Sequence, residues 1–282
     1  NVSTAQTSRN QFVWVPVENV NEIYGTDKNG KKWGKLYEFS ESGIIARNWT
    51  EQDGVMSIIK TSKSVSNREP DVVIGNGTEH DADNNNLQEA GLGSSATSST
   101  FKTQLETEFD NMIASVEKYG GFYIGRYETG NLCQEKASVI KNNSDIYNQS
   151  WYTMYKKAKG IAVNGSVTSS MIWGSQWDAT LRWMYNSGNA EKKKYTYDST
   201  DKGNYNGTNG NKPIATGSID AYAVNNIYDM AGNVLDRTIE ARSTDFRVSR
   251  GGSSSNNGSA SDRYNDLTYS NDRVGFRVAL YM

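Results

Sequence analysis

The sequence predicts a mixed α+β fold in which short helices and short strands are connected by long loops. Residues 103–118 carry apolar side chains at helical spacing with charged residues between them, which is the pattern of an amphipathic helix. Residues 12–17 and 274–280 instead have the apolar or alternating character of strands. Polar tracts occur throughout and no linker divides the chain, so we expect one domain across residues 1–282.

Further elements follow from the same periodicities. One helix is expected to begin near Trp151 and another to span about 175–185, because aromatic and apolar residues recur on one face of each. Residues 122–128 predict a strand, which a pair of glycines separates from the preceding helix. Two stretches lack either periodicity. Residues 18–100 predict a loop-rich insertion, with long surface loops over 61–100, and residues 186–220 predict another polar loop.

The composition argues against several classes of protein. The formal net charge is -2 and no basic face or arm is evident, so we expect no nucleic-acid partner. Cys133 and His80 are the single cysteine and histidine, which leaves no intramolecular disulfide, no Cys/His metal site and no Cys/His catalytic pair. We interpret both as plain loop residues. No stretch approaches about 18 consecutive apolar residues, so we expect no membrane insertion.

Four segments, taken in order, resemble a known superfamily. They are Tyr119-Gly-Gly-Phe-Tyr-Ile-Gly-Arg-Tyr-Glu128, Met171-Ile-Trp-Gly-Ser-Gln-Trp-Asp178, Asn226-Ile-Tyr-Asp-Met-Ala-Gly-Asn-Val-Leu-Asp236, and Arg250-Gly-Gly-Ser253 closing with Val274-Gly-Phe-Arg277. The set is similar to the formylglycine-generating-enzyme (sulfatase-modifying factor) superfamily. The resemblance covers roughly residues 105–282 and implies a C-type lectin-type fold.

Two branches of that superfamily lead to different functions. One oxidises a substrate cysteine with copper and two cysteines that follow the Arg-Gly-Gly-Ser motif. Those positions fall here at about Asn256 and Ser261, and neither supplies the thiolate that such chemistry requires. We therefore expect no enzyme and no required cofactor. The other branch comprises variable proteins of diversity-generating retroelements, which bind ligands. The sequences of the first two motifs resemble those of such proteins from gut bacteria and their phages.

The resemblance implies that about residues 253–273 form a hypervariable ligand-binding surface. The segment is rich in Ser, Asn and Tyr, which antibody loops also use, although such composition by itself is also typical of a plain loop. The expected variable contacts are Ser253, Ser255, Asn256, Asn257, Tyr264, Asp266, Tyr269, Asn271 and Arg273. Tyr264, Tyr269 and Arg273 would be the anchors, because aromatic and arginine side chains dominate binding hot spots. The expected scaffold residues are Gly251, Gly252, Gly275, Phe276 and Arg277.

The enzyme branch also implies a calcium ion. Its ligands would map onto the side chains of Asp229 and Asp236 and the carbonyl oxygens of Gly232 and Val234. Two carboxylates and two carbonyls suit a hard cation. The alternative is that the two aspartates only make hydrogen bonds within turns.

These observations predict a non-catalytic binding protein whose C-terminal surface is diversified by adenine-directed mutagenesis. Its partner would be a protein or cell-surface ligand of variable identity. We expect it outside the cell, on a bacterial surface or a phage virion, and we interpret the start at Asn1 as a chain trimmed of a signal peptide or anchor. The alternatives are a fixed adhesin, pilus-tip or phage receptor-binding domain without diversification, and, with less support, a formylglycine-generating-type oxidase.

Overall fold

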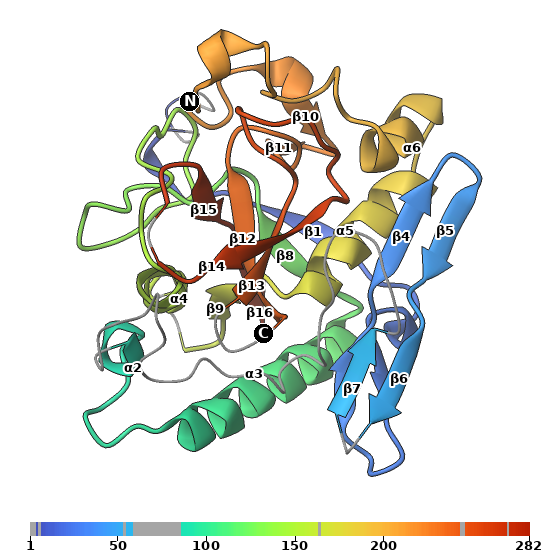
Figure 1. Ribbon diagram of the computed structural model, residues 1–282, viewed down its shortest axis with the longest axis vertical. Coiled ribbons are helices and arrows are strands. Elements are labelled where there is room, and N and C mark those ends of the chain that lie inside the picture. Colours follow the sequence, from blue (N-terminus) through green and yellow to red (C-terminus); the bar gives the residue numbers. More distant parts are fainter. Residues whose placement is uncertain are drawn as a thin grey trace.

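The computed structural model describes residues 4, 7–52, 55–58, 86–162, 165–242, 246–269 and 271–282. Within these residues the chain is mixed α+β, as the sequence predicts (Figure 1). Two four-stranded sheets form its centre, and helices and small hairpins surround them. None of the described helices is long and apolar enough to cross a membrane.

The first sheet contains the strands nearest both ends of the chain. Its order is β1 (Phe12–Pro16), β8 (Gly121–Gly125), β16 (Val278–Tyr281) and β9 (Thr168–Met171). Every neighbouring pair is antiparallel. The two predicted end strands therefore lie in one sheet, with β8 between them.

The second sheet carries the segment predicted to vary. Its order is β14 (Arg263–Leu267), β13 (Phe246–Arg250), β12 (Leu235–Ala241) and β15 (Val274–Phe276). β12 and β15 run parallel, whereas the other pairs are antiparallel. Among the described strands, β14 lies at the edge of the sheet and pairs with β13 alone.

One predicted strand is divided in the structure. Residues 274–280 form β15 in the second sheet and β16 in the first, with Arg277 between them. The Arg277 side chain is fully buried and donates to the carbonyl oxygens of Gly125 and Tyr228. The prediction of one continuous strand failed because both pieces are buried, so the apolar alternation continues across the change of sheet.

The three predicted helices all occur, and the described chain has two further ones, α2 (Asn86–Glu89) and α6 (Ala190–Tyr197). The predicted three are α3 (Ser98–Tyr119), α4 (Trp151–Lys159) and α5 (Gly174–Asn186). α3 begins five residues before the predicted helix, because Thr97 accepts a hydrogen bond from the Thr100 amide and caps it. α6 lies in the stretch predicted as a polar loop. Its polar sequence carries no apolar stripe, and Asn189 caps its start.

The insertion over 18–100 contains hairpins instead of continuous loop. The three antiparallel pairs are β2 (Tyr24–Thr26) with β3 (Lys32–Gly34), β4 (Tyr37–Ser40) with β5 (Gly43–Ala46), and β6 (Trp49–Gln52) with β7 (Val55–Ile58). Strands of three or four residues are too short to show alternation in the sequence. In Figure 1 the β4–β5 hairpin (blue) lies beside α5. The part of the predicted loop at 59–85 lies outside the described residues.

The smaller elements complete the described chain. They are the pair β10 (Ala223–Val224) with β11 (Ile227–Tyr228) and the 3-10 turns Val20–Glu22, Asn209–Asn211 and Asp220–Tyr222.

The core combines aromatic rings with buried arginines. Trp151, Trp173 and Trp177 are fully buried, as the high aromatic content predicts. The arginines whose side chains are buried with them are Arg237, Arg247, Arg250, Arg263 and Arg277. Arginine is almost never fully buried unless it is paired. The partners of these five side chains therefore show which segments of the chain are attached to the core.

Candidate functional site

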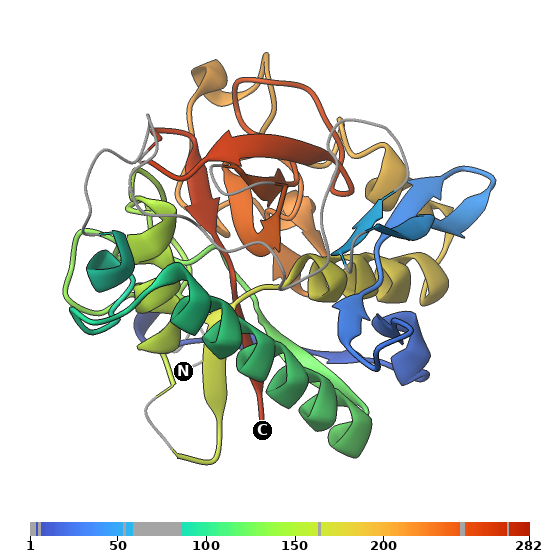
Figure 2. The same cartoon turned by 60° about the horizontal axis from the view of Figure 1, so that its bottom comes forward.

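Residues 253–273 run from the end of β13 through a loop, along β14 at the sheet edge, and through a second loop into β15. Buried residues precede and follow the segment, so both of its ends are fixed in the core. In Figure 2, β14 (red) lies in the upper half of the molecule and the C-terminus in the lower half. The segment therefore forms part of the surface remote from the C-terminal end.

The nine predicted contact residues divide by exposure. Asn257, Tyr269 and Arg273 are exposed, with Tyr269 at 43%. Ser255, Asn256, Tyr264 and Asn271 are half-buried. Two of the three predicted anchors, Tyr269 and Arg273, thus point outward, whereas Ser253 and Asp266 do not.

Ser253 and Asp266 require a correction, because the structure uses them internally. Ser253 is 1% exposed, and its backbone N–H donates to Asn256 Oδ1 at 2.7 Å. Asp266 accepts hydrogen bonds from Arg237 Nε at 2.9 Å and from Ser249 Oγ at 3.1 Å. The partners of Asp266 lie on β12 and β13, so no local pattern in the sequence indicates them.

Three half-buried residues also support their own loops. Asn256 accepts the Ser253 hydrogen bond just described, and Asn271 Oδ1 accepts one from the Arg273 amide at 3.0 Å. The Tyr264 hydroxyl donates to Asp262 Oδ2 at 3.2 Å. Burial, with the negative charge of Asp262, raises the pKa of Tyr264 above its ordinary value. Tyr264 therefore helps to hold its own loop through this hydrogen bond. Of the three predicted anchors, Tyr269 and Arg273 are the more exposed.

Arg237 on β12 holds the second half of the segment by its backbone. Its Nη2 donates to the carbonyl oxygens of Leu267 and Tyr269, both at 2.6 Å. Its Nη1 donates to the Thr268 carbonyl at 3.3 Å and to the Gln149 carbonyl at 3.1 Å. Burying these carbonyls without donors would be costly, and one guanidinium satisfies them all.

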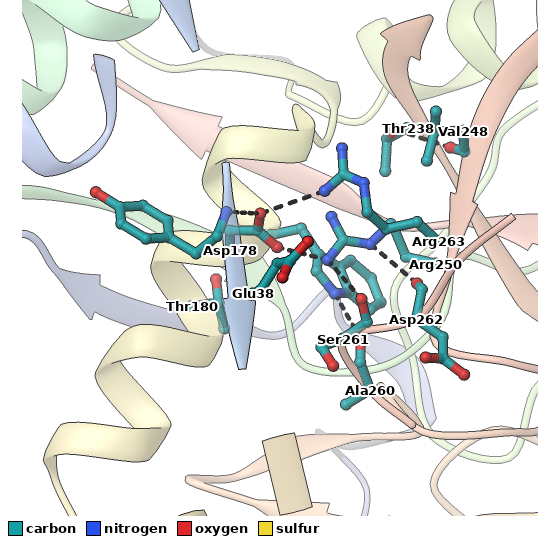
Figure 3. Close-up of polar contacts among 12 residues, drawn as sticks. Glu38, Asp178, Thr180, Thr238, Val248, Arg250, Ala260, Ser261, Asp262 and Arg263 are labelled. Carbon is teal, nitrogen blue, oxygen red and sulfur yellow. Dashed lines mark hydrogen bonds and ion pairs between the residues drawn. The ribbon is translucent and has the colours of Figure 1, made fainter. Parts of the chain in front are cut away.

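Arg250 and Asp178 hold the first half of the segment (Figure 3). Arg250 donates to the carbonyl oxygens of Asp262 at 3.1 Å and Ser261 at 3.2 Å. Its Nη2 lies 2.5 Å from Asp178 Oδ1, and Arg263 Nη1 lies 3.3 Å from Asp178 Oδ2. Arg263 also forms an ion pair with Glu240.

Trp177 adds a further contact to the same loop. Its indole Nε1 donates to the Ala260 carbonyl at 2.9 Å. The loop before β14 and the loop after it are therefore both fastened through main-chain oxygens to side chains of α5, β12 and β13. Those attachments do not depend on the outward side chains of the segment.

The two aspartates implied as calcium ligands make hydrogen bonds and an ion pair within the protein. Asp229 Oδ2 accepts hydrogen bonds from Thr216 Oγ1 at 2.9 Å and from the Gly217 amide at 2.8 Å. Asp236 Oδ2 lies 3.3 Å from Arg277 Nε, so a cationic side chain already faces this carboxylate. In the described part of the chain, no group of three or more His, Cys, Asp or Glu side chains is placed to hold a metal ion.

A third buried acid, Glu128, lies near these aspartates and was not singled out from the sequence. Its Oε2 accepts from Asn233 Nδ2 at 2.6 Å, and its Oε1 accepts from the Val234 amide at 3.3 Å. Burial raises the pKa of Glu128, and the charges of Asp229 and Asp236 raise it further. Burial also raises the pKa of Asp236, to about 6. Glu128 ends the first of the four motifs, and that was the signal available for finding it.

The resemblance would place the two enzyme cysteines at about residues 256 and 261, where this sequence has Asn256 and Ser261. Cys133 is a free, exposed thiol, and its backbone N–H donates to Asp145 Oδ2. His80 lies outside the described residues.

Comparison with protein-family models and with curated proteins returned no match for this chain.

Proposed function

We propose that this chain is a non-catalytic ligand-binding protein with a C-type lectin-type fold and a diversified C-terminal surface. The observation that carries the proposal is the attachment of residues 253–273 through their backbone. Arg237 and Arg250 bind carbonyl oxygens on both halves of the segment. A segment held in this way can change its outward side chains without losing its attachments.

The outward residues have the chemistry of a binding surface. Tyr269 and Arg273 are of the types that dominate binding hot spots, and Ser255 and Asn257 supply adaptable hydrogen bonds. All four are exposed or half-buried. A rigid platform with exchangeable loop residues is the general arrangement by which one scaffold serves many ligands.

The superfamily resemblance draws support from contacts among the four motifs. Glu128 of the first motif binds Asn233 of the third, and Asp178 of the second pairs with Arg250 of the fourth. Residues that lie 105 and 72 positions apart thus meet in two buried contacts. That juxtaposition is expected if the motifs form the common core of a shared fold, whereas chance resemblances would be scattered.

The proposed biological setting follows from the resemblance. The protein would act outside the cell, on a bacterial surface or a phage virion, and its targets would be proteins or other cell-surface ligands. Adenine-directed mutagenesis by a retroelement would supply the variation. Because neither Asn256 nor Ser261 provides a thiolate, the proposal includes no catalytic step.

Sequencing the 3′ end of this gene and its flank across a natural population tests the proposal. We expect substitutions to concentrate at the codons for Ser255, Asn257, Tyr269 and Arg273, at adenines of a nearby near-identical repeat, beside a reverse-transcriptase gene. The buried positions of the same segment, Ser253, Ser254, Arg263 and Thr268, provide the internal control and should vary less. Equal variation across the gene, with no repeat, would refute diversification and favour a fixed adhesin.

A further inference from the structure

The loop between β13 and β14 contains an asparagine followed directly by a glycine, Asn257 and Gly258. The carboxamide of an asparagine can be attacked by the backbone nitrogen of the next residue, and a glycine at that position leaves the attack unhindered because it has no side chain. The sequence has six such Asn-Gly pairs, and the structure describes four of them in full, at Asn29, Asn206, Asn209 and Asn257. The contacts of these four pairs differ, and the difference distinguishes Asn257.

Hydrogen bonds restrain the reacting groups of the other three described pairs. The Gly30 amide donates to a backbone carbonyl at 3.0 Å, and the Gly207 amide donates to Asn211 Oδ1 at 2.6 Å. In the third pair the group that would leave is held, since Asn209 Nδ2 donates to Asn204 Oδ1 at 3.1 Å. In each pair a hydrogen bond must therefore break before the attack can begin.

The pair at 257–258 lacks this restraint. Asn257 is exposed, and its carboxamide makes no hydrogen bond to any residue that the structure describes. The Gly258 amide likewise has no acceptor within the described chain. The Asn257 carbonyl accepts a hydrogen bond from the Tyr264 hydroxyl at 3.4 Å, but neither reacting group takes part in that contact.

The loop is fastened on both sides of the pair. Before it, the Ser253 amide donates to Asn256 Oδ1 at 2.7 Å. After it, the Ser259 amide donates to Asp262 Oδ2 at 3.1 Å. The attacking nitrogen and the carboxamide belong to adjacent residues between these two contacts. They can therefore meet by local rotation, while the fastened parts of the loop stay in place.

We propose that Asn257 is a site of spontaneous deamidation on the candidate binding surface. The Gly258 backbone nitrogen attacks Asn257 Cγ, and the new N–Cγ bond closes a succinimide ring. The Cγ–Nδ2 bond breaks, and Nδ2 leaves as ammonia together with the proton that the Gly258 nitrogen loses. A water molecule then adds to either carbonyl carbon of the ring and opens it, which gives aspartate or isoaspartate at position 257. Nothing is oxidised or reduced, and water is the only co-reactant.

The reaction changes the surface in two ways. Both products place a carboxylate, and so a negative charge at neutral pH, at an exposed position. Isoaspartate also routes the main chain through the side-chain carbon, which lengthens the backbone between the contacts of Asn256 and Ser259. The chemistry does not depend on the proposed function. Its effect on a ligand does, and a diversified variant with another residue at position 257 would lack the site.

Incubation of the full chain in mildly alkaline buffer, followed by fragment-ion mass spectrometry of its proteolytic peptides, tests the inference. We expect deamidation at Asn257 to be about tenfold faster than at Asn206 and Asn209, because one hydrogen bond of ordinary strength must first break at each of those sites. The rate should rise with pH, since the attacking amide must lose its proton. In heavy-oxygen water the new carboxylate should carry the label, because water opens the ring.

Two controls relate the difference to the fold. In concentrated urea the four pairs should react at similar rates, because their hydrogen bonds are lost. Asn211→Gly removes the acceptor of the Gly207 amide and keeps a residue type that tolerates the φ of +58° at this position. Asn206 should then react about tenfold faster, while the rate at Asn257 should not change.

Several outcomes would overturn the inference. They are a rate at Asn257 no higher than at Asn206 and Asn209 in the folded chain, a lead of Asn257 that persists in urea, and a product without heavy oxygen. An unchanged rate at Asn206 in the Asn211→Gly variant would also overturn it, because hydrogen bonding would not then select the site. A reactive Asn257 in a gene whose outward codons do not vary would refute diversification and support the deamidation site.

Discussion

Replacing Arg237 with methionine should destabilise the fold strongly, whereas the same change at Arg273 should not. Arg237→Met keeps an elongated side chain but removes donors from Asp266 and from the carbonyls of residues 267–269. Breaking a buried charge pair costs about 3–5 kcal/mol, because the remaining charge stays buried without compensation. At about 2–4 °C per kcal/mol for a chain of this size class, the Tm should fall by roughly 10 °C.

Arg273→Met is the matched control from the same segment. The Arg273 side chain is 51% exposed, and its ion pair with Asp272 at 3.9 Å is a solvated contact. Such pairs contribute little to stability, so the free energy of unfolding should change by less than about 0.5 kcal/mol. Urea unfolding followed by circular dichroism measures both variants. Hydrogen exchange at the Trp151 amide, which donates to the Thr268 carbonyl at 2.8 Å, reports whether the segment has loosened locally.

The reasoning fails if Arg237→Met costs less than about 1 kcal/mol, or if the two variants cost the same. Either result would mean that Arg237 is not a main attachment of the segment. The proposed function would then lose the support that it takes from this side chain.

Three further predictions concern other parts of the core. Asp178→Asn should lower the free energy of unfolding by about 3–5 kcal/mol in urea titrations, because two buried arginines lose a shared anion; a cost below about 1 kcal/mol would contradict the network in Figure 3. Burial raises the folded-state pKa of Glu128 and raises that of Asp236 to about 6, so the stabilising contribution of Asp236 is full below its unfolded value near pH 4 and is lost as the pH rises through about 6. The Tm should therefore fall between about pH 4 and 6, and Asp236→Asn should flatten that slope, whereas an unsloped wild-type profile would refute the assignment. Gly251→Ala should cost several kcal/mol in thermal unfolding, because Gly251 has φ +88° and an added Cβ would lie 2.6 Å from the Met230 carbonyl oxygen; a fully stable variant would contradict this geometry.

Periodicity in the sequence located the larger elements because each buries one face. The helices near 103–118, Trp151 and 175–185 all occur, with boundaries that shift where a cap extends the helix. The hairpins of the 24–58 region were missed, since strands of three or four residues leave no periodic signal. α6 was missed for a related reason, because its exposure leaves it polar on almost every face.

The candidate site was less predictable than the fold. Composition and resemblance predicted the location of the segment but not which of its side chains are exposed. Ser253 and Asp266 face the protein, whereas Tyr269 and Arg273 face solvent. For Asp266 that separation depends on Arg237, whose position beside this carboxylate follows from strand pairing in three dimensions. Sequence statistics place arginine at the surface, so they give no warning of a buried arginine network.

The choice of arginine for these buried positions has a physical reason. An irregular segment leaves backbone carbonyls that no neighbouring strand satisfies, and water cannot reach those that are buried. A guanidinium presents five donors in a fixed plane and stays charged, so a single side chain can bind several carbonyls and a carboxylate together. Arg237 does this for residues 266–269 and Arg250 for residues 261–262. Because every residue type offers the same carbonyl oxygen, this mode of attachment is indifferent to the outward side chains. Lysine could not replace these arginines, since one ammonium cannot span the same set of acceptors.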